Sequence, residues 1–366
     1  MDPQDSLTLV DTPRAPGHSR PTRRATTMVV LISAVAVLTV IAGLLPVPYV
    51  VLGPGPTENT LGTLSDGTPL IKITGRRTYP TTGHLNLVTV SVTGGPGYHL
   101  DLLTALRGWV DGAVAVVPED VVFPPNTSAS EVQQQNTQEM TGSQQDATYV
   151  ALRHLGVPVG EQVVVQSLVS GSPADGHLKP GDVILSVDGA PTSSPEAVRA
   201  VIQAHKPGDT ITLSVLRDGK PMSVSVVAVS QSGRTVVGFY PGTKFSFPFT
   251  VAIDPGNIGG PSAGLMFALG IIDKLTPGNL TGGKFIAGTG TIDSTGSVGA
   301  IGGIQQKLAA ARAAGATFFL TPAGNCAEAL AADPAGLRLV KVSSLDSALA
   351  ALADIRAGTA APSCTG

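Results

Sequence analysis

The stretch Phe249–Gly270, FTVAIDPGNIGGPSAGLMFALG, decides how the C-terminal part of this chain folds. It starts as a strand, passes through a glycine-rich loop and ends in an apolar run that predicts a helix. Pro261 suits the first turn of that helix, where a missing N–H is harmless. Ser262 is therefore expected at a helix N-terminus, among unpaired N–H groups that stabilise a nucleophile or an oxyanion. Glycines such as Gly260 let a substrate backbone approach closely.

A second stretch supplies a base for this hydroxyl. Residues 289–298, TGTIDSTGSV, are typical of a hairpin, and residues 299–311, GAIGGIQQKLAAA, become a helix. Lys307 is the single cation among Gly, Ala, Ile and Leu. Shielding from water favours the neutral amine and lowers the pKa of a lysine from about 10.4 toward the range of a useful base. Lys307 would then take the proton of Ser262, as histidine does in a catalytic triad.

Together the two stretches resemble the proteolytic domain of Lon proteases, which use a Ser–Lys dyad. The motif GGPSAG at 259–264 and the segment from GTGTID to TPAGN at 288–325 carry this resemblance, which covers residues 240–355. It implies an α/β domain with Ser262 as nucleophile and Lys307 as general base. The residues expected to support this dyad are Thr289, Gly260, Pro261 and Asp254.

One position departs from the Lon pattern. Many Lon proteins have an acidic residue three positions before the serine, and this chain has Gly259 there. Asp254 is the nearest carboxylate that would replace it. Residues 278–284, GNLTGGK, fit a phosphate-loop pattern, but Phe285 stands where Ser or Thr would bind magnesium. We therefore expect no ATPase module, no ATP, no other cofactor and no metal.

Residues 156–235 form a compact unit with strong turn signals. Its motifs GSPA at 171–174 and LKPGDVILSVDG at 178–189 resemble those of bacterial protease-associated PDZ domains. Ser194 caps a helix that begins at Pro195. The predicted elements of this unit are a strand at Val163–Val169, a helix at Pro195–His205, and strands at Thr210–Arg217 and Met222–Val229.

The PDZ resemblance implies a peptide groove. A peptide would add as a strand along Val163–Val169, against the helix. The carboxylate-binding loop is expected near Val157–Gly160, although GVPVG at 156–160 departs from the usual GLGF-like loop. The side chains expected to line the groove are Val163, Val164, Val165, Val198 and Ile202.

Residues 27–48 are predicted to anchor the chain in a membrane. Met28–Leu45 is almost continuously apolar, and about 18–20 such residues cross a bilayer as a helix. The arginines Arg20, Arg23 and Arg24 precede it, so residues 1–26 are expected in the cytoplasm and the rest of the chain outside. A cleaved signal peptide is the alternative, but Leu45–Tyr49 is a poor cleavage site.

The segment between the anchor and the PDZ unit, residues 49–155, is predicted to be β-rich at first. Apolar residues alternate at Leu70–Ile73 and at Leu85–Val92. Residues 126–155 are rich in Gln and Ser, with apolar residues at helical spacing, and form either a helical connector or a loop. The fold class is therefore α+β: one transmembrane helix, a β-rich exported region, a PDZ domain, a Lon-type α/β domain and a C-terminal tail at 356–366.

Composition limits the partners. The 366 residues carry a net charge of −3 without a basic cluster beyond the N-terminus, which excludes a nucleic-acid binder. Cys326 and Cys364 have no zinc-ligand spacing. In an oxidising compartment they would either pair and hold the tail, or remain two separate thiols.

The combination of anchor, PDZ unit and Lon-type domain resembles bacterial Lon-like proteases that lack the ATPase module. It predicts a membrane-bound, ATP-independent serine endopeptidase that cleaves exported or membrane-associated proteins, with peptides or unfolded proteins as substrates. Lon-type domains commonly form hexamers, so a homo-oligomeric ring is expected. The alternative, suggested by Gly259, is a catalytically silent, membrane-tethered PDZ scaffold. A trypsin-like site is excluded, because Ile258 takes the serine's place in GNIGGP at 256–261.

Overall fold

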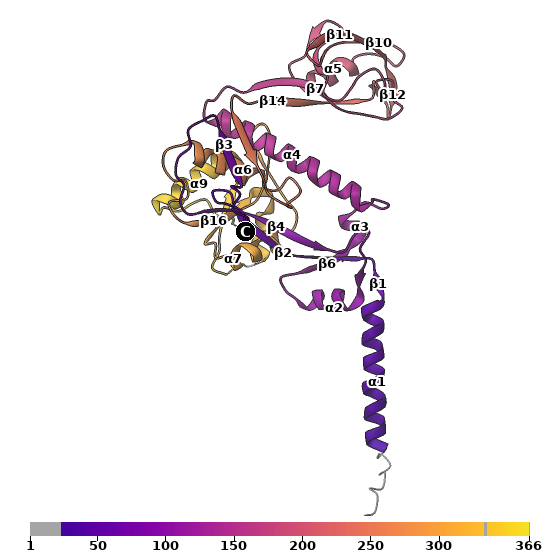
Figure 1. Cartoon of the computed structure of the whole chain (residues 1–366), viewed down its shortest axis with the longest axis vertical. Coiled ribbons are helices and arrows are strands. Elements are labelled where there is room, and N and C mark those ends of the chain that lie inside the picture. The colour runs from indigo at the N-terminus through magenta and orange to yellow at the C-terminus, as the bar shows by residue number, and fades with distance from the viewer. Residues whose placement is uncertain (1–22, 333–334, 366) are drawn as a thin grey trace, which may run out of the picture.

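The computed structural model describes residues 23–332 and 335–365 (Figure 1). Its helices are α1 (Arg23–Leu44), α2 (Leu102–Val110), α3 (Glu119–Val122), α4 (Ala129–His154), α5 (Pro195–Gln203), α6 (Gly264–Leu275), α7 (Ile304–Ala313), the 3₁₀ turn η1 (Ala323–Asn325), α8 (Cys326–Ala331) and α9 (Leu345–Ala357). Its strands before the PDZ unit are β1 (Pro46–Val47), β2 (Tyr49–Asn59), β3 (Ile71–Thr74), β4 (His84–Thr93), β5 (Leu100–Asp101) and β6 (Ala115–Pro118).

The remaining strands follow α4. Those of the PDZ region are β7 (Gly160–Leu168), β8 (Val183–Val187), β9 (Ala190–Pro191), β10 (Thr210–Arg217), β11 (Lys220–Val227), β12 (Val229–Gln231), β13 (Arg234–Val236) and β14 (Phe239–Ser246). Those of the C-terminal region are β15 (Thr250–Ile253), β16 (Phe285–Gly288), β17 (Thr291–Ile292), β18 (Val298–Gly299), β19 (Phe318–Pro322) and β20 (Arg338–Val342). The mixed α+β class and the single N-terminal helix agree with the prediction from sequence.

Helix α1 is a candidate membrane anchor that extends away from the rest of the molecule (Figure 1). Within the described residues, Thr26–Leu44 is the one helical segment long and apolar enough to cross a bilayer, and none of it is buried in the protein. At 1.5 Å per residue it spans roughly 29 Å, the thickness of a hydrocarbon core. The helix ends before residue 48, the predicted limit of the anchor, because Pro46 cannot continue it and Pro46–Val47 instead pairs with β5.

A six-stranded sheet forms the centre of the molecule, in the order β20-β19-β16-β4-β2-β6. Strands β20, β19, β16 and β4 run parallel, and β2 is antiparallel to both of its neighbours. Three of these strands come from the predicted region 49–155 and three from 240–355. The sheet therefore crosses the predicted division, because alternating apolar residues identify a strand without identifying its partner.

Helices cover both faces of this sheet. Alternate residues of each strand point to opposite sides. Ile286 joins the core beneath α6 and α9, whereas its neighbour Ala287 joins the core beneath α7 and α8. The helix that follows the predicted nucleophile and the helix that carries the predicted base are thus held on opposite faces of one rigid sheet.

Helix α4 settles the choice left open for residues 126–155. Its first turn is held by a capping box, in which Ser128 and Glu131 satisfy each other's backbone N–H groups. The helix runs from the region near α1, past α6, to the PDZ unit (Figure 1). It therefore connects three parts of the molecule that are far apart in sequence.

The PDZ region is a second sheet, in the order β11-β10-β8-β7-β14, with α5 packed against it. Strand β10 has the predicted bounds, and α5 ends at Gln203, two residues before its predicted end. The strand at the edge, β14, lies beyond residue 235, where the sequence had placed the end of the unit. The PDZ sheet therefore extends further along the chain than predicted.

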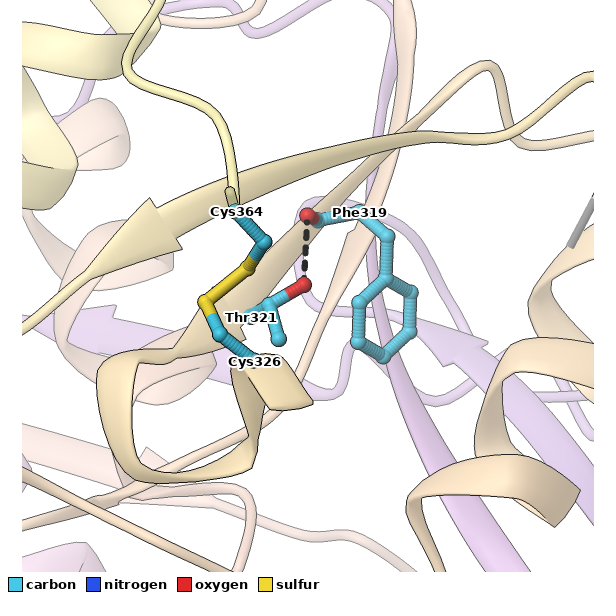
Figure 2. Close-up of a disulfide and its surroundings, with 4 residues drawn as sticks. All are labelled: Phe319, Thr321, Cys326 and Cys364. Atoms are coloured by element: carbon cyan, nitrogen blue, oxygen red, sulfur yellow. Dashed lines mark hydrogen bonds between the residues drawn. A yellow bond between two sulfur atoms is a disulfide. The ribbon is translucent and has the colours of Figure 1, made fainter. Parts of the chain in front are cut away.

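The two cysteines form a disulfide that holds the C-terminal tail (Figure 2). Cys326 begins α8, and its Cα lies 5.3 Å from that of Cys364. The tail lies along β20, since Lys341 N–H donates to the Pro362 carbonyl and Cys364 N–H donates to the Leu339 carbonyl. The disulfide thus fixes a segment that covers the open edge of the central sheet.

Substitution Cys364→Ser should lower the thermal unfolding midpoint by roughly 5–10 °C, because a cross-link of this loop size contributes about 2–4 kcal/mol. Differential scanning calorimetry with and without reductant measures this. Cys326→Ser should give the same loss, and reductant should lower the midpoint of the unsubstituted protein only. An unchanged midpoint in both variants would contradict a stabilising role.

Candidate active site

Ser262 lies in the loop between β15 and α6. The helix begins at Gly264 with Ala263 as its N-cap, so Ser262 and Pro261 precede the helix instead of forming its first turn. The reason is that the Ser262 carbonyl accepts hydrogen bonds from Gly290 N–H at 2.8 Å and from Thr289 Oγ1 at 3.0 Å. These bonds direct the carbonyl away from the helix axis and fix the serine backbone against the loop that follows β16.

Lys307, on α7, reaches the serine hydroxyl directly. Its Nζ lies 2.8 Å from Ser262 Oγ, 3.1 Å from Thr289 Oγ1 and 3.1 Å from the Val88 carbonyl oxygen. A neutral amine has two N–H groups and one lone pair. The Thr289 and Val88 oxygens can accept the two N–H groups, which leaves the lone pair directed at the Ser262 hydroxyl.

Burial sets the protonation of this amine. Only 3% of Lys307 is exposed, and among the described residues no carboxylate is bonded to it. Removal from water penalises the ammonium form and lowers the pKa of Lys307 from 10.5 to about 8. A sizeable fraction of neutral lysine therefore exists near neutral pH, as a general base requires.

Helix α4 contacts the loop before α6, which contains Ser262, from the other side. The Asn136 carbonyl accepts the Gly260 N–H at 3.2 Å, and Ser143 Oγ donates to the Pro261 carbonyl at 3.0 Å. A Cβ added to Gly259 would lie 2.9 Å from Asn136 Cβ. The space that an acidic side chain at position 259 would need is therefore occupied by α4. Asn136, Ser143 and Val88 were not predicted, because only the tertiary structure brings them to the serine.

The predicted supporting residues lie in different positions relative to Ser262 and Lys307. Thr289 Oγ1 donates to the Ser262 carbonyl and accepts a hydrogen bond from Lys307 Nζ. Gly260 has φ +83, a conformation that favours glycine. Asp254 is exposed, and its carboxylate accepts the Gly256 N–H at 3.0 Å within a turn. Asp254 therefore stabilises the loop locally and is not one of the groups bonded to the lysine.

A cavity of about 330 Å³ opens in front of the serine. Lys307 is its one charged lining residue; the others are Pro56, Val88, Thr89, Val90, Asn257, Ile258, Gly259, Gly260, Ser262, Ala263 and Gly302. Within the described residues, the N–H groups of Ser262 and Ala263 have no hydrogen-bond acceptor. The cavity thus presents a serine hydroxyl, a buried lysine amine and free N–H donors in surroundings that are otherwise uncharged.

The predicted PDZ groove is not where the sequence placed it. Strand β7, which includes Val163, Val164 and Val165, pairs with β14 on one side and with β8 on the other. It therefore has no free edge in the described sheet to which a peptide could add. Val198 and Ile202 are buried in the same core instead of lining a groove. The strand partner was missed because it follows the region that resembled a PDZ domain.

The free edge beside α5 belongs to β14. The chain enters β14 through Gly238, whose φ is +91 and whose added Cβ would meet Ser172 Cβ at 2.1 Å. The carbonyls of Val237 and Gly238 accept N–H groups of Ala174 and Val169. A glycine is thus required where the chain turns into the edge strand.

Comparisons with known proteins agree with both units. Residues 133–227 match the PDZ domain model, and residues 252–352 match the model of the Lon protease (S16) C-terminal proteolytic domain. The PDZ domain of the SdrC-like protein from Listeria innocua is a similar solved structure, with 27% identity, 22% of this chain and 92% of that chain covered, and a TM-score of 0.21.

Curated relatives match over short segments. The magnetosome formation protease MamE of Paramagnetospirillum magneticum is 42% identical over 74 residues, which are 20% of this chain and 10% of the relative. The periplasmic serine endoprotease DegP of Escherichia coli is 43% identical over 74 residues, 20% of this chain and 15% of DegP. Lon protease of Clostridioides difficile is 48% identical over 67 residues, 17% of this chain and 8% of that protein.

The chain therefore spans a small part of the length of these relatives. On the family matches, it contains a PDZ domain and a Lon-type (S16) C-terminal proteolytic domain, preceded by one candidate membrane-anchoring helix.

Proposed function

We propose that this protein is a membrane-anchored, ATP-independent serine endopeptidase in which Ser262 is the nucleophile and Lys307 the general base. The observation that carries the proposal is the 2.8 Å approach of a buried lysine amine to the serine hydroxyl. An exposed lysine would be protonated and could not accept a proton. Here burial lowers the pKa of Lys307 to about 8, which makes proton transfer feasible.

The reaction begins when neutral Lys307 takes the proton of Ser262 Oγ as that oxygen attacks the scissile carbonyl carbon. The carbonyl oxygen becomes an oxyanion, which the free N–H groups of Ser262 and Ala263 are placed to stabilise. The Lys307 ammonium then gives its proton to the leaving amine, and the C–N bond breaks. In the second half, Lys307 takes a proton from water, which attacks the acyl-enzyme, and returns it to Ser262 Oγ.

Two acceptors orient the base. Thr289 Oγ1 and the Val88 carbonyl hold the amine so that its lone pair is directed at Ser262 in the neutral state. After proton transfer, the same oxygens accept hydrogen bonds from the ammonium, which limits the destabilisation of a charge in this buried place. Thr289 is in this account a positioning residue.

The cellular location follows from the ends of the chain. Arg23 and Arg24 precede the span, which favours a cytoplasmic N-terminus and an exported catalytic domain. The Cys326–Cys364 disulfide fits an oxidising compartment, and DegP, a relative by part of its length, is described as periplasmic. ATP is absent from such a compartment, so flexible or unfolded exported proteins are the proposed substrates.

A hexameric ring is also part of the proposal, and sedimentation velocity tests it.

The PDZ unit is proposed to recruit these substrates through β14. A peptide would add antiparallel to the free edge of this strand, with α5 forming the other wall of the groove. Pro241, which lacks an N–H donor, is tolerated at an edge strand. This replaces β7, which lies inside the sheet, as the peptide-binding strand.

Replacing either member of the dyad should abolish peptidase activity. Ser262→Ala, Lys307→Met and Lys307→Arg should each lower kcat/KM by about 10²–10⁴-fold or more, since Arg restores the charge but offers no lone pair. Initial rates on casein or a fluorogenic peptide measure this, with unfolding midpoints checked alongside. Lys284→Ala, on an exposed lysine, is the matched control. Unchanged activity in either dyad variant would contradict the dyad, whereas no activity in the unsubstituted protein would favour the silent PDZ scaffold.

The pH dependence should report the titration of Lys307. Because its pKa is lowered to about 8, kcat/KM should rise with pH and level off above an inflection near 8. The direction follows from the neutral amine being the active form. The profile is obtained by measuring kcat/KM at constant ionic strength from pH 6 to pH 10, in steps of about one pH unit. A profile that falls over this range would argue against a lysine base.

Blocking the edge of β14 should abolish peptide binding. Successive N–H groups along a strand point to opposite sides, so one of Thr243 and Lys244 donates toward the free edge. Both Thr243→Pro and Lys244→Pro are prepared, and the one that keeps the unfolding midpoint of the unsubstituted protein is used. This variant should lose affinity for a C-terminal peptide selected from a library. Calorimetry measures the affinity. Val227→Pro, on the opposite edge strand β11, should bind normally. Full affinity in a folded β14 variant would exclude this groove.

A further inference from the structure

Helix α2 exposes apolar side chains where a helix on a water-facing surface exposes polar ones. Its buried side is formed by Ala105 and Gly108, packed against β2 and β6. An added Cβ at Gly108 would lie 2.6 Å from a methyl group of Val116, so the helix is close to the sheet. On the other side Trp109 is 55% exposed and Val110 is 86% exposed.

The large apolar residues of α2 form one continuous face. At 100° per residue, their five side chains cover an arc of about 120°. Leu106, Trp109 and Val110 are exposed, and Leu102 and Leu103, at the start of the helix, are partly buried. Arg107 is exposed at the margin of this arc. An outward apolar face bordered by a basic side chain is the pattern of a helix that lies in a membrane interface.

The position of α2 connects this face to the candidate anchor. Leu102 N–H, at the start of α2, donates to the carbonyl of Leu45 just after α1, at 3.1 Å. Strand β1 pairs with β5 immediately before α2, with Val47 opposite Leu100. Asp101 then caps α2 by accepting the Thr104 N–H at 2.9 Å. The chain is thus held so that α2 begins at the level where α1 ends.

Figure 1 shows α2 beside the end of α1, at about the same level and on the side of the molecule from which α1 projects. A helix in that place lies along the membrane surface when α1 spans the bilayer. Trp109 also packs edge-to-face on Tyr49, with ring centroids 5.9 Å apart. Trp and Tyr are the residues that concentrate at membrane–water interfaces.

We infer that α2 is a second membrane contact, in which Leu106, Trp109 and Val110 insert into the interfacial layer of the leaflet where α1 emerges. This rests on α1 spanning the membrane, as proposed above. A lipid surface is the occupant because the apolar face is continuous with the exposed end of α1, where Leu44 is 77% exposed. Apolar burial drives the insertion, since Arg107 is the one basic residue of α2.

This contact would orient the catalytic domain. Helix α2 packs on β2 and β6, β2 pairs with β4, and the Val88 carbonyl of β4 accepts a hydrogen bond from Lys307. A short series of rigid contacts therefore leads from the lipid surface to the catalytic amine. The active site would be held at a fixed height and orientation relative to the membrane.

Trp109 is the chain's one tryptophan, so its fluorescence reports on α2 alone. The full chain is reconstituted in phosphatidylcholine vesicles with or without bromine on the acyl chains. Brominated lipid should quench Trp109 emission by about half or more, whereas aqueous acrylamide should quench it little, and high salt should not change either result. Emission that is quenched by acrylamide but not by brominated lipid would overturn the inference.

Matched variants assign the effect to the apolar face. Leu106→Glu combined with Val110→Glu should return Trp109 to the aqueous quencher. Leu185→Glu in the PDZ region starts from nearly the same exposure, 44% against 43% for Leu106, and should leave the quenching unchanged. An unaffected Leu106/Val110 double variant would also overturn the inference.

Alkaline carbonate extraction of the same vesicles separates this inference from the proposed anchor. If the protein stays in the vesicles but Trp109 is exposed to water, the proposed membrane contact of α2 is wrong and the proposed anchor stands. Release of the protein by carbonate removes the anchor, and the inference with it. Loss of peptidase activity in the dyad variants bears on neither result.

Discussion

The catalytic unit depends on one contact: an amine removed from water and held against a serine hydroxyl. Its four participants, Val88, Ser262, Thr289 and Lys307, come from β4, two loops and α7. A buried lysine is destabilised unless its hydrogens find acceptors. The surrounding structure is arranged to supply them, and the sheet between α6 and α7 keeps the two helices at the required separation.

This contact explains why the central sheet is assembled from segments on both sides of the PDZ unit. The Lon-type segment contributes β16, β19 and β20 to this sheet. The segment before the PDZ unit contributes β4, which carries the Val88 carbonyl, and β2, which pairs with β4. The PDZ unit is inserted between these two contributions, and α4 bridges the gap while bonding to the nucleophile loop. The segment after α1 is therefore part of the Lon-type fold and not a separate spacer.

The sequence predicted what local patterns encode. The glycine-rich loop identified Ser262, the apolar surroundings identified Lys307, and Thr289 followed from the family resemblance; the structure brings all three together. Pairing between distant segments was not predictable, because strand alternation does not specify a partner. That is why Val88 and Ser143 were missed, why β7 was taken for an edge strand, and why Asp254 was considered as a substitute carboxylate.

The close packing of Gly259 against Asn136 also constrains how this protein can evolve. Both positions cannot carry a side chain while α4 stays in place, because their Cβ atoms would be only 2.9 Å apart. An acidic residue could return to position 259 only if residue 136 became glycine, which weakens a helix by about 1 kcal/mol, or if α4 shifted. Substitutions at the two sites are therefore expected to covary among descendants of this sequence. Whichever substitution occurs first would lower the stability of the protein.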